Sequence, residues 1–206
     1  MKITKKWAIS NNACQGGVDW LLGQKETDGE KLVAKVMSHN LDWANWLVVR
    51  LMTHKQQIKY AIYAAKQVID IYERKYPEDK RPRLAIEAAE NYLKNPSATN
   101  ADNAAAKAAY AAAYAAAVAK AAKAAKAANA AAYAGYAAKA VAYSAYAVAY
   151  AANADNAAAY AAKAVAYSAY AVAYAAKAAN AADAAESDMK RGIILYGLKL
   201  LTKKDE

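Results

Sequence analysis

The 206-residue chain contains no phenylalanine, one cysteine and only three prolines. Its single cysteine, Cys14, excludes a disulfide within the chain and is typical of a reducing compartment. The basic start of the chain lacks the apolar core of a signal peptide. The longest uncharged run of its alanine-rich part, 140–154, is shorter than the about 18–20 apolar residues that a membrane span needs. We therefore expect a cytoplasmic protein that does not span a membrane.

Acidic residues are outnumbered by basic ones, which gives the chain a formal net charge of +10. The excess is shared between 1–96, 97–185 and 186–206, which contribute +5, +4 and +1. No segment is a basic tail, so any affinity for anions is spread over the chain. Association with nucleic acid is therefore an alternative function, in which lysines would contact phosphates and tyrosines would stack on bases.

Sequence motifs of enzymes are absent as well. The chain has no phosphate-binding loop, no GxGxxG and no GxSxG. His39 and His54 have no acidic or cysteine partner at the spacing of a metal site. We therefore predict no enzymatic activity, no catalytic residue, no metal and no cofactor. A pocket lined by tyrosines that binds a small ligand such as a nucleotide is a third hypothesis.

The composition changes at Asn95-Pro96-Ser97, which divides the chain into 1–95 and 96–206. The first part is an ordinary globular sequence that holds all four tryptophans and both histidines. The second part is built mostly from Ala, Tyr, Lys and Val, and it contains the string YAAKAVAYSAYAVAYAA twice, at 136–152 and at 160–176. We expect the two parts to form one continuous assembly.

Periodic apolar residues in the first part predict amphipathic helices. The clearest stripe has alternating steps of four and three residues and consists of Ile58, Ile62, Ala65, Ile69, Tyr72 and Tyr76. It predicts one long helix that ends at Tyr76, because Pro77 disfavours helical geometry in the residue before it. Pro82 suits the first turn of a second helix, which we expect to run to about Lys94.

Alanine propagates helices in the second part, and the expected interruptions are Asn129 and Asn153–Asn156. We predict helices at about 103–128, 130–152, 155–182 and 187–203. Each copy of the repeat has one tyrosine stripe at heptad spacing with valines opposite. Because the copies begin 24 residues apart, their stripes can face a common core only if the chain turns at Asn153–Asn156. The predicted fold class is all-α, a multi-helix bundle with long, closely packed helices rich in Ala and Tyr.

A corner between two predicted helices, 77–90, is rich in charge. Asp79 could cap the second helix, and Arg83 and Glu87 are four residues apart and could form an ion pair. This arrangement fits an ionic contact that fixes the angle between the helices. It also fits a recognition site for an acidic partner.

Three groups of residues resemble those of one known family: Ala13-Cys14 with Gly17 and Asp19-Trp20-Leu21, then Asp42-Trp43-Ala44-Asn45-Trp46-Leu47, then Arg81-Pro82 with Ala85-Ile86-Glu87-Ala88-Ala89-Glu90. Over about residues 7–95 the chain resembles the Imm5-like immunity protein family, small all-helical proteins of bacteria and their phages. The alanine-rich part is similar only in composition. The resemblance implies a protein that binds and neutralises a toxin-like partner, and it brings no catalytic residues with it.

The predicted function is therefore non-enzymatic binding of a protein partner, either a toxin or a component of host defence. The chain would act as an immunity protein or as a phage anti-defence factor. Tryptophan and arginine dominate the energetics of interfaces, so side chains of these types are candidate contacts. The candidates are Arg81, Arg83 and Glu87 at the corner, together with Trp43 and Trp46 where these are exposed.

Overall fold

The computed structural model describes residues 1–97, 99–100, 103–104, 106, 143, 163–164, 167 and 182–202, without the side chains at 71, 72, 75 and 182–185. Its helices are α1 Lys5–Ser10, α2 Gln15–Leu22, α3 Gly29–Val36, α4 Leu41–Leu51, α5 His54–Lys66, α6 Ile69–Lys75, α7 Arg81–Lys94 and α11 Ala182–Thr202. No strand occurs among these residues, so the all-α prediction is confirmed. In the same residues, no helix is both long and apolar enough to cross a membrane.

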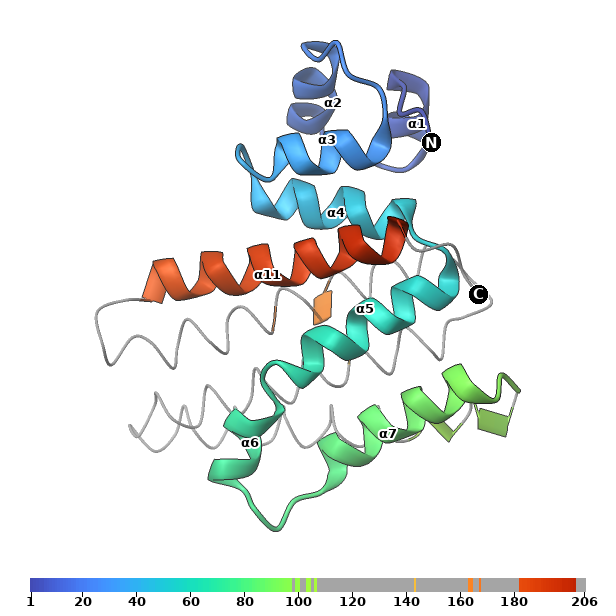
Figure 1. Cartoon of the computed structure of the whole chain (residues 1–206), viewed down its shortest axis with the longest axis vertical. Helices are drawn as coiled ribbons and strands as arrows, with labels where there is room; N and C mark the ends of the chain where they lie inside the picture. The colour runs from blue at the N-terminus through green and yellow to red at the C-terminus, as the bar shows by residue number, and fades with distance from the viewer. Residues whose placement is uncertain are drawn as a thin grey trace.

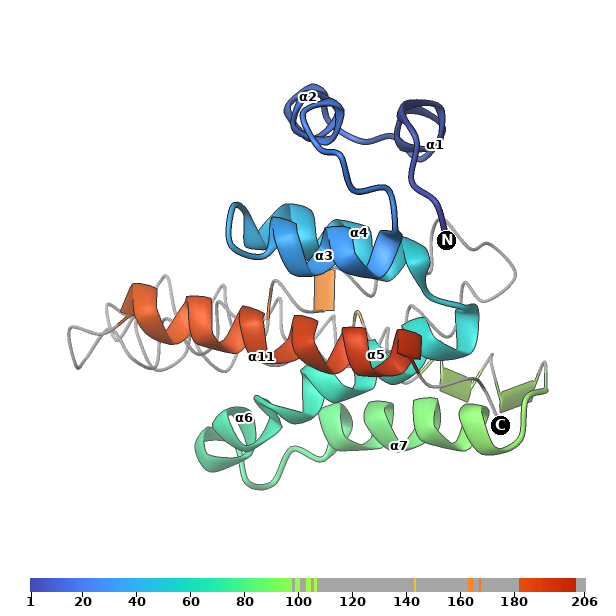
Figure 2. The same ribbon diagram turned by 45° about the horizontal axis from the view of Figure 1, so that its top comes forward.

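The helices are stacked in layers (Figure 1), and α11 lies between α4 and α5 and contacts both. Helices α1 and α2 lie beside each other on the outer side of α3 and α4 (Figure 2). The main core is formed by apolar residues of α3, α4, α5 and α11. A second core cluster joins α5 to α7. The end of the chain therefore completes a core that its first half begins.

Short polar side chains begin α1, α3, α4 and α5 by accepting hydrogen bonds from free backbone N–H groups. Asn40 Oδ1 accepts from the N–H groups of Asp42 and Trp43 at 3.0 Å and so begins α4. Thr53 and Gln56 form a reciprocal capping box at the start of α5. These caps fix where α4 and α5 begin, and with them the positions of the side chains that form the core.

The predicted apolar stripe is confirmed in part. Ile58, Ile62, Ala65 and Ile69 all lie in the cluster between α5 and α7. The prediction of one continuous helix up to Tyr76 is wrong, because the chain breaks at Gln67 and Val68, where α5 ends and α6 begins. The Val68 N–H donates to Ala65 O, a bond one residue shorter than in an α-helix, and this tightened turn buries Val68 beside Ile69. Tyr72 belongs to the residues whose side chains are not described.

The helices predicted at 103–128, 130–152 and 155–182 lie almost wholly outside the described residues, as does the predicted turn at Asn153–Asn156. One described contact bears on that turn. Tyr143 and Tyr167, which occupy the same position in the two copies of the repeat, stack with ring centroids 5.0 Å apart. A straight helix would separate residues 24 positions apart by about 36 Å, so Tyr143 and Tyr167 do not lie on one straight helix.

Helix α11 confirms the predicted last helix and docks through an unusually close contact. A Cβ atom placed on Gly197 would lie 2.8 Å from Cε2 of Tyr60 and 3.0 Å from Cε of Met52. Tyr60 is fully buried and donates its hydroxyl hydrogen to Asn45 Oδ1 at 3.0 Å. Gln56 Nε2 donates to the backbone oxygen of Leu200 at 2.6 Å. Glycine is therefore required at position 197 for α11 to reach α5.

We expect Gly197→Ala to destabilise the protein by roughly 1–3 kcal/mol, because the buried Tyr60 ring cannot move aside without strain elsewhere in the core. Gly192→Ala on the same helix is the matched control, because a Cβ there meets no atom within 4 Å. The control should stabilise the protein by about 0.5–1 kcal/mol through helix propensity. Urea unfolding of the two variants checks this, and equal midpoints would contradict the proposed contact.

We also expect the stability to fall as the pH drops below about 6.5. The Nε2 atom of His54 is buried and has no hydrogen-bond partner, and burial lowers the pKa of this histidine. As the pH falls, the unfolded chain takes up the proton first. The contribution of neutral His54 to the stability is therefore complete above the pKa that this histidine has in the unfolded chain, and it is lost as the pH falls through the pKa of the folded protein. Unfolding free energies measured across this range should depend less on pH in His54→Gln.

Candidate functional site

All four tryptophans of the chain line one pocket of about 310 Å³. They come from three helices: Trp7 from α1, Trp20 from α2, and Trp43 and Trp46 from α4. We call this site the tryptophan pocket; its other lining residues are Ile3, Ala8, Asn12, Ala13, Cys14, Gly17, Leu21, Val36, Asp42 and Leu47. The four indoles are only partly buried, so the walls of the pocket are aromatic surfaces that a binding partner could contact.

The turn between α1 and α2 is fixed by local and long-range contacts. Asn12 adopts a φ of 58°, a left-handed conformation that asparagine tolerates better than most residues. The Arg50 guanidinium on α4 donates from Nε to the backbone oxygen of Asn11 at 3.0 Å. On α2, a Cβ at Gly16 would lie 3.2 Å from Cζ2 of Trp43, so α2 approaches that indole closely. The outer helices are thus held over the aromatic face of α4.

The aromatic rings of the pocket contact one another in a defined order. Trp7 meets Trp46 edge to face, with centroids 6.0 Å apart and an interplanar angle of 73°. Arg50 lies over the Trp46 ring at 4.7 Å, a cation–π distance. On the other side, His39 stacks on Trp20 at 5.9 Å and contacts Trp43 at 5.4 Å. These contacts position the rings before any partner arrives.

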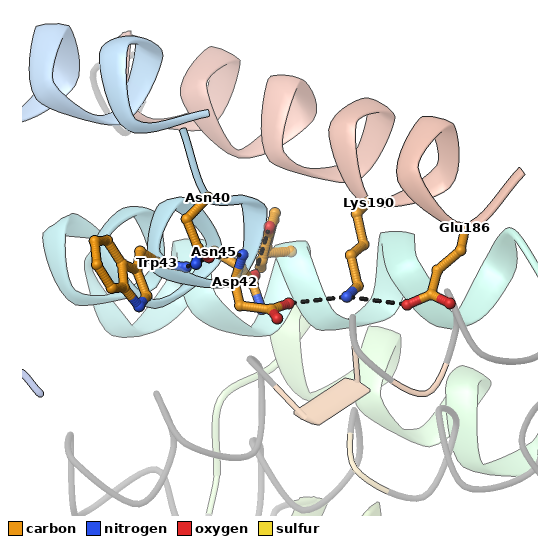
Figure 3. Close-up of polar contacts among 7 residues, drawn as sticks. Asn40, Asp42, Trp43, Asn45, Glu186 and Lys190 are labelled. Atoms are coloured by element: carbon orange, nitrogen blue, oxygen red, sulfur yellow. Dashed lines mark hydrogen bonds and ion pairs between the residues drawn. The ribbon is translucent and has the colours of Figure 1, made fainter. Parts of the chain in front are cut away.

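Asp42 lies on the pocket wall and ties the pocket to the end of the chain. Its Oδ1 accepts a hydrogen bond from Lys190 Nζ on α11 at 2.9 Å, and the same ammonium group lies 3.1 Å from a carboxylate oxygen of Glu186 (Figure 3). Burial alone would lower the pKa of Lys190, but the two carboxylates outweigh this effect and raise it. The charge of Asp42 is therefore balanced by a cation of the same chain.

The predicted corner between two helices is present, and its arginines form ion pairs with carboxylates of the same chain. Asp79 accepts hydrogen bonds from the backbone N–H and the guanidinium of Arg81. The predicted cap is shifted, because Lys80 occupies the N-cap position of α7 and makes no capping hydrogen bond through its side chain. The guanidinium of Arg83 donates to both carboxylate oxygens of Glu73 on α6, with Nε to Oε1 at 2.6 Å. This pair lowers the pKa of Glu73 and raises that of Arg83. The suggested pairing of Arg83 with Glu87 is replaced by this contact, because α6 brings Glu73 closer, and Glu87 is exposed.

The structure therefore separates the sequence-predicted contact residues into two places. Trp43 and Trp46 line the tryptophan pocket, whereas Arg81, Arg83 and Glu87 lie on α7, far from α1 and α2 (Figure 1). Sequence reasoning did not select Trp7, Trp20 or Arg50 for the site. The available signal was that all four tryptophans fall within the first 46 residues, which is typical of one shared cluster.

No group of three or more His, Cys, Asp or Glu side chains in the described part of the chain is arranged to hold a metal ion. Cys14 is an exposed free cysteine on the pocket wall. The polar groups of the pocket are few and its walls are aromatic, which suits recognition by shape and apolar contact.

Fold and site together define a small all-helical protein with an aromatic pocket on its surface. The chain belongs to the family of immunity protein Imm5, whose family model matches residues 45–191. Membership in this family indicates an immunity function. No curated protein and no solved structure matches the chain.

The extent of the match differs from the resemblance seen in the sequence. It begins at Asn45 rather than near residue 7, and it continues through the alanine-rich part to residue 191. Trp46 and the corner at Arg81 lie inside it, whereas Trp43, α1, α2 and α3 lie before it. The family match therefore covers most of α4, all of α5, α6 and α7, and part of α11, but of the tryptophan pocket it includes only Trp46 and Leu47.

We expect a coupling free energy of about 0.2–1 kcal/mol between Asp42 and Lys190, the range of solvent-exposed ion pairs, because Asp42 is largely exposed. A double-mutant cycle of Asp42→Asn and Lys190→Met, followed by urea unfolding, measures it. The coupling should shrink in high salt. Lys199→Met in place of Lys190→Met is the control, since Lys199 is an exposed lysine of α11, and a coupling of equal size there would contradict the assignment.

Proposed function

We propose that this protein neutralises a toxin by binding it directly as one folded unit, without chemical modification of either partner. The observation that supports the proposal is the match of residues 45–191 to the Imm5 immunity family. The aromatic pocket agrees with it, because exposed tryptophan surface held in a fixed geometry is a common anchor of tight protein interfaces.

The charge of the chain defines the expected partner more closely. A net charge of +10 attracts acidic surfaces over long range and repels basic ones. The surface through which the toxin contacts this protein should therefore be acidic. Toxins whose contact surface is a basic phosphate-binding cleft fit this chain poorly, because like charges brought face to face cost several kcal/mol.

Co-expression of this chain with candidate toxin domains should identify one whose inhibition of growth it relieves, and titration calorimetry with that domain should show a saturable complex with one molecule of each. The association rate should fall as salt rises, because steering between unlike charges is screened within about 10 Å at 0.1 M salt. A chain that leaves the toxin fully active and forms no complex with it would contradict the proposal.

A nucleic-acid control belongs to the same experiment. Double-stranded DNA and RNA are titrated at low salt, where binding by counterion release is strongest. Nucleic-acid binding that is tight at low salt and lost steeply with salt, in a chain that does not bind the toxin domain, would favour the alternative function.

A further inference from the structure

We propose that the tryptophan pocket is the anchor site for the toxin, and that it takes one bulky aromatic side chain that is flanked by carboxylates on the toxin surface. This inference rests on the proposed function and adds the place and the chemistry of recognition to it. The pocket would decide which toxin the protein accepts.

The shape and walls of the pocket argue for an aromatic ring. Its volume of about 310 Å³ is at the lower end of the range of about 300–1,000 Å³ that ligand pockets occupy. The four indoles present both faces and edges, and aromatic rings prefer edge-to-face and offset stacked neighbours. Trp7 and Trp46 already adopt the edge-to-face arrangement. A ring that enters the pocket beside this pair would find aromatic faces and edges in the same arrangement, and the Trp7–Trp46 contact would stay intact.

The charge around the pocket argues for carboxylates beside that ring. The four helices that line it carry five cationic and three acidic side chains. Lys5 and Lys6 are exposed on α1, next to Trp7, and Lys190 pairs with Asp42 on the pocket wall as well as with Glu186. A cationic occupant is disfavoured by this surplus. A segment that places Asp or Glu on either side of the aromatic residue matches it.

The position of the pocket relative to the family match argues for a role in specificity. Of its lining residues only Trp46 and Leu47 fall within 45–191, and the others precede it. The family model matches the chain from Asn45 onward, whereas α1 and α2 with their turn, which precede the match, supply most of the pocket. Contacts that distinguish one toxin from another would then lie on this part of the chain.

Two built-in reporters allow the pocket to be observed directly. Cys14 is the single cysteine of the chain, is exposed, and lies on the pocket wall, so its alkylation rate reports whether the pocket is filled. All four tryptophans line the pocket, so the indole N–H signals in an NMR spectrum all come from its walls.

The test measures alkylation of Cys14 by N-ethylmaleimide with and without the toxin domain identified by the growth assay. We expect the bound toxin domain to slow the reaction at least tenfold and to shift the indole N–H signals. An alkylation rate unchanged in a complex that forms normally would overturn this inference and leave the proposed function standing. Failure of the wild-type complex to form would instead overturn the proposed function.

One substitution that fills the pocket, and a matched control elsewhere, test the same inference without removing any contact. Gly17→Leu places a large side chain at the pocket wall, where a Cβ meets Cys14 Sγ at an ordinary 3.5 Å. Gly192→Leu makes the same change on α11, where nothing lies within 4 Å. We expect Gly17→Leu to weaken toxin binding at least tenfold and Gly192→Leu to leave it unchanged, with both variants folded by circular dichroism. Should Gly17→Leu fail to fold, the alkylation experiment on the wild-type chain decides.

Other occupants give distinct outcomes that overturn the inference. Free indole that slows alkylation of Cys14 while the toxin domain does not would make the pocket a small-molecule site. Protection of Cys14 that grows with protein concentration in the absence of toxin would show that a second copy fills it. Loss of toxin binding in Arg81→Ala with Arg83→Ala, but not in Gly17→Leu, would place the anchor at the corner on α7.

Discussion

The contact of Gly197 with the Tyr60 ring is the constraint on which the rest of the described structure depends. It lets α11 approach α5 so closely that a single methyl group at position 197 would overlap the ring. Tyr60 in turn is held by its hydrogen bond to Asn45, which places it against α4. One close approach therefore brings three helices together, two from the first part of the sequence and one from its end. Burial of the phenol raises its pKa far above the ordinary value, so the hydroxyl remains a hydrogen-bond donor at any physiological pH.

The tryptophan pocket depends on this packing indirectly, through helix α4. The inner face of α4 is buried against α3 and α11, which leaves the indoles of Trp43 and Trp46 directed toward α1 and α2. Lys190 reaches from α11 to Asp42 on the pocket wall, and Arg50 reaches from the end of α4 to the turn between α1 and α2. The core and the pocket thus share α4, and a shift of this helix would change both.

Much of the fold could be read from the sequence, because its helices carry strong local signals. The apolar stripe from Ile58 to Ile69, the start of α7 near Pro82 and the last helix are all present. Periodicity could not reveal the break at Gln67, because Val68 and Ile69 are both apolar and both buried. Whether the chain continues as one helix or turns at this point depends on packing against other helices. The pairing of Arg83 with Glu73 could not be read either, because it depends on the angle between α6 and α7 rather than on spacing along one helix. The tryptophan pocket unites residues from Ile3 to Leu47 through tertiary contacts that no spacing in the sequence encodes.

The two groups of predicted contact residues differ in what a partner would have to displace. At the corner, each arginine already holds a carboxylate of its own chain through paired hydrogen bonds, so a toxin carboxylate would replace one good ion pair with another. Exchange of this kind gains little, because the cost of separating the existing pair offsets the new contact. In the tryptophan pocket the indoles are only partly buried, and an entering apolar group removes additional surface from water. Apolar burial, unlike exchange of ion pairs, is a net gain for each group that enters. This difference is the physical reason to propose the pocket, rather than the corner, as the anchor for a toxin.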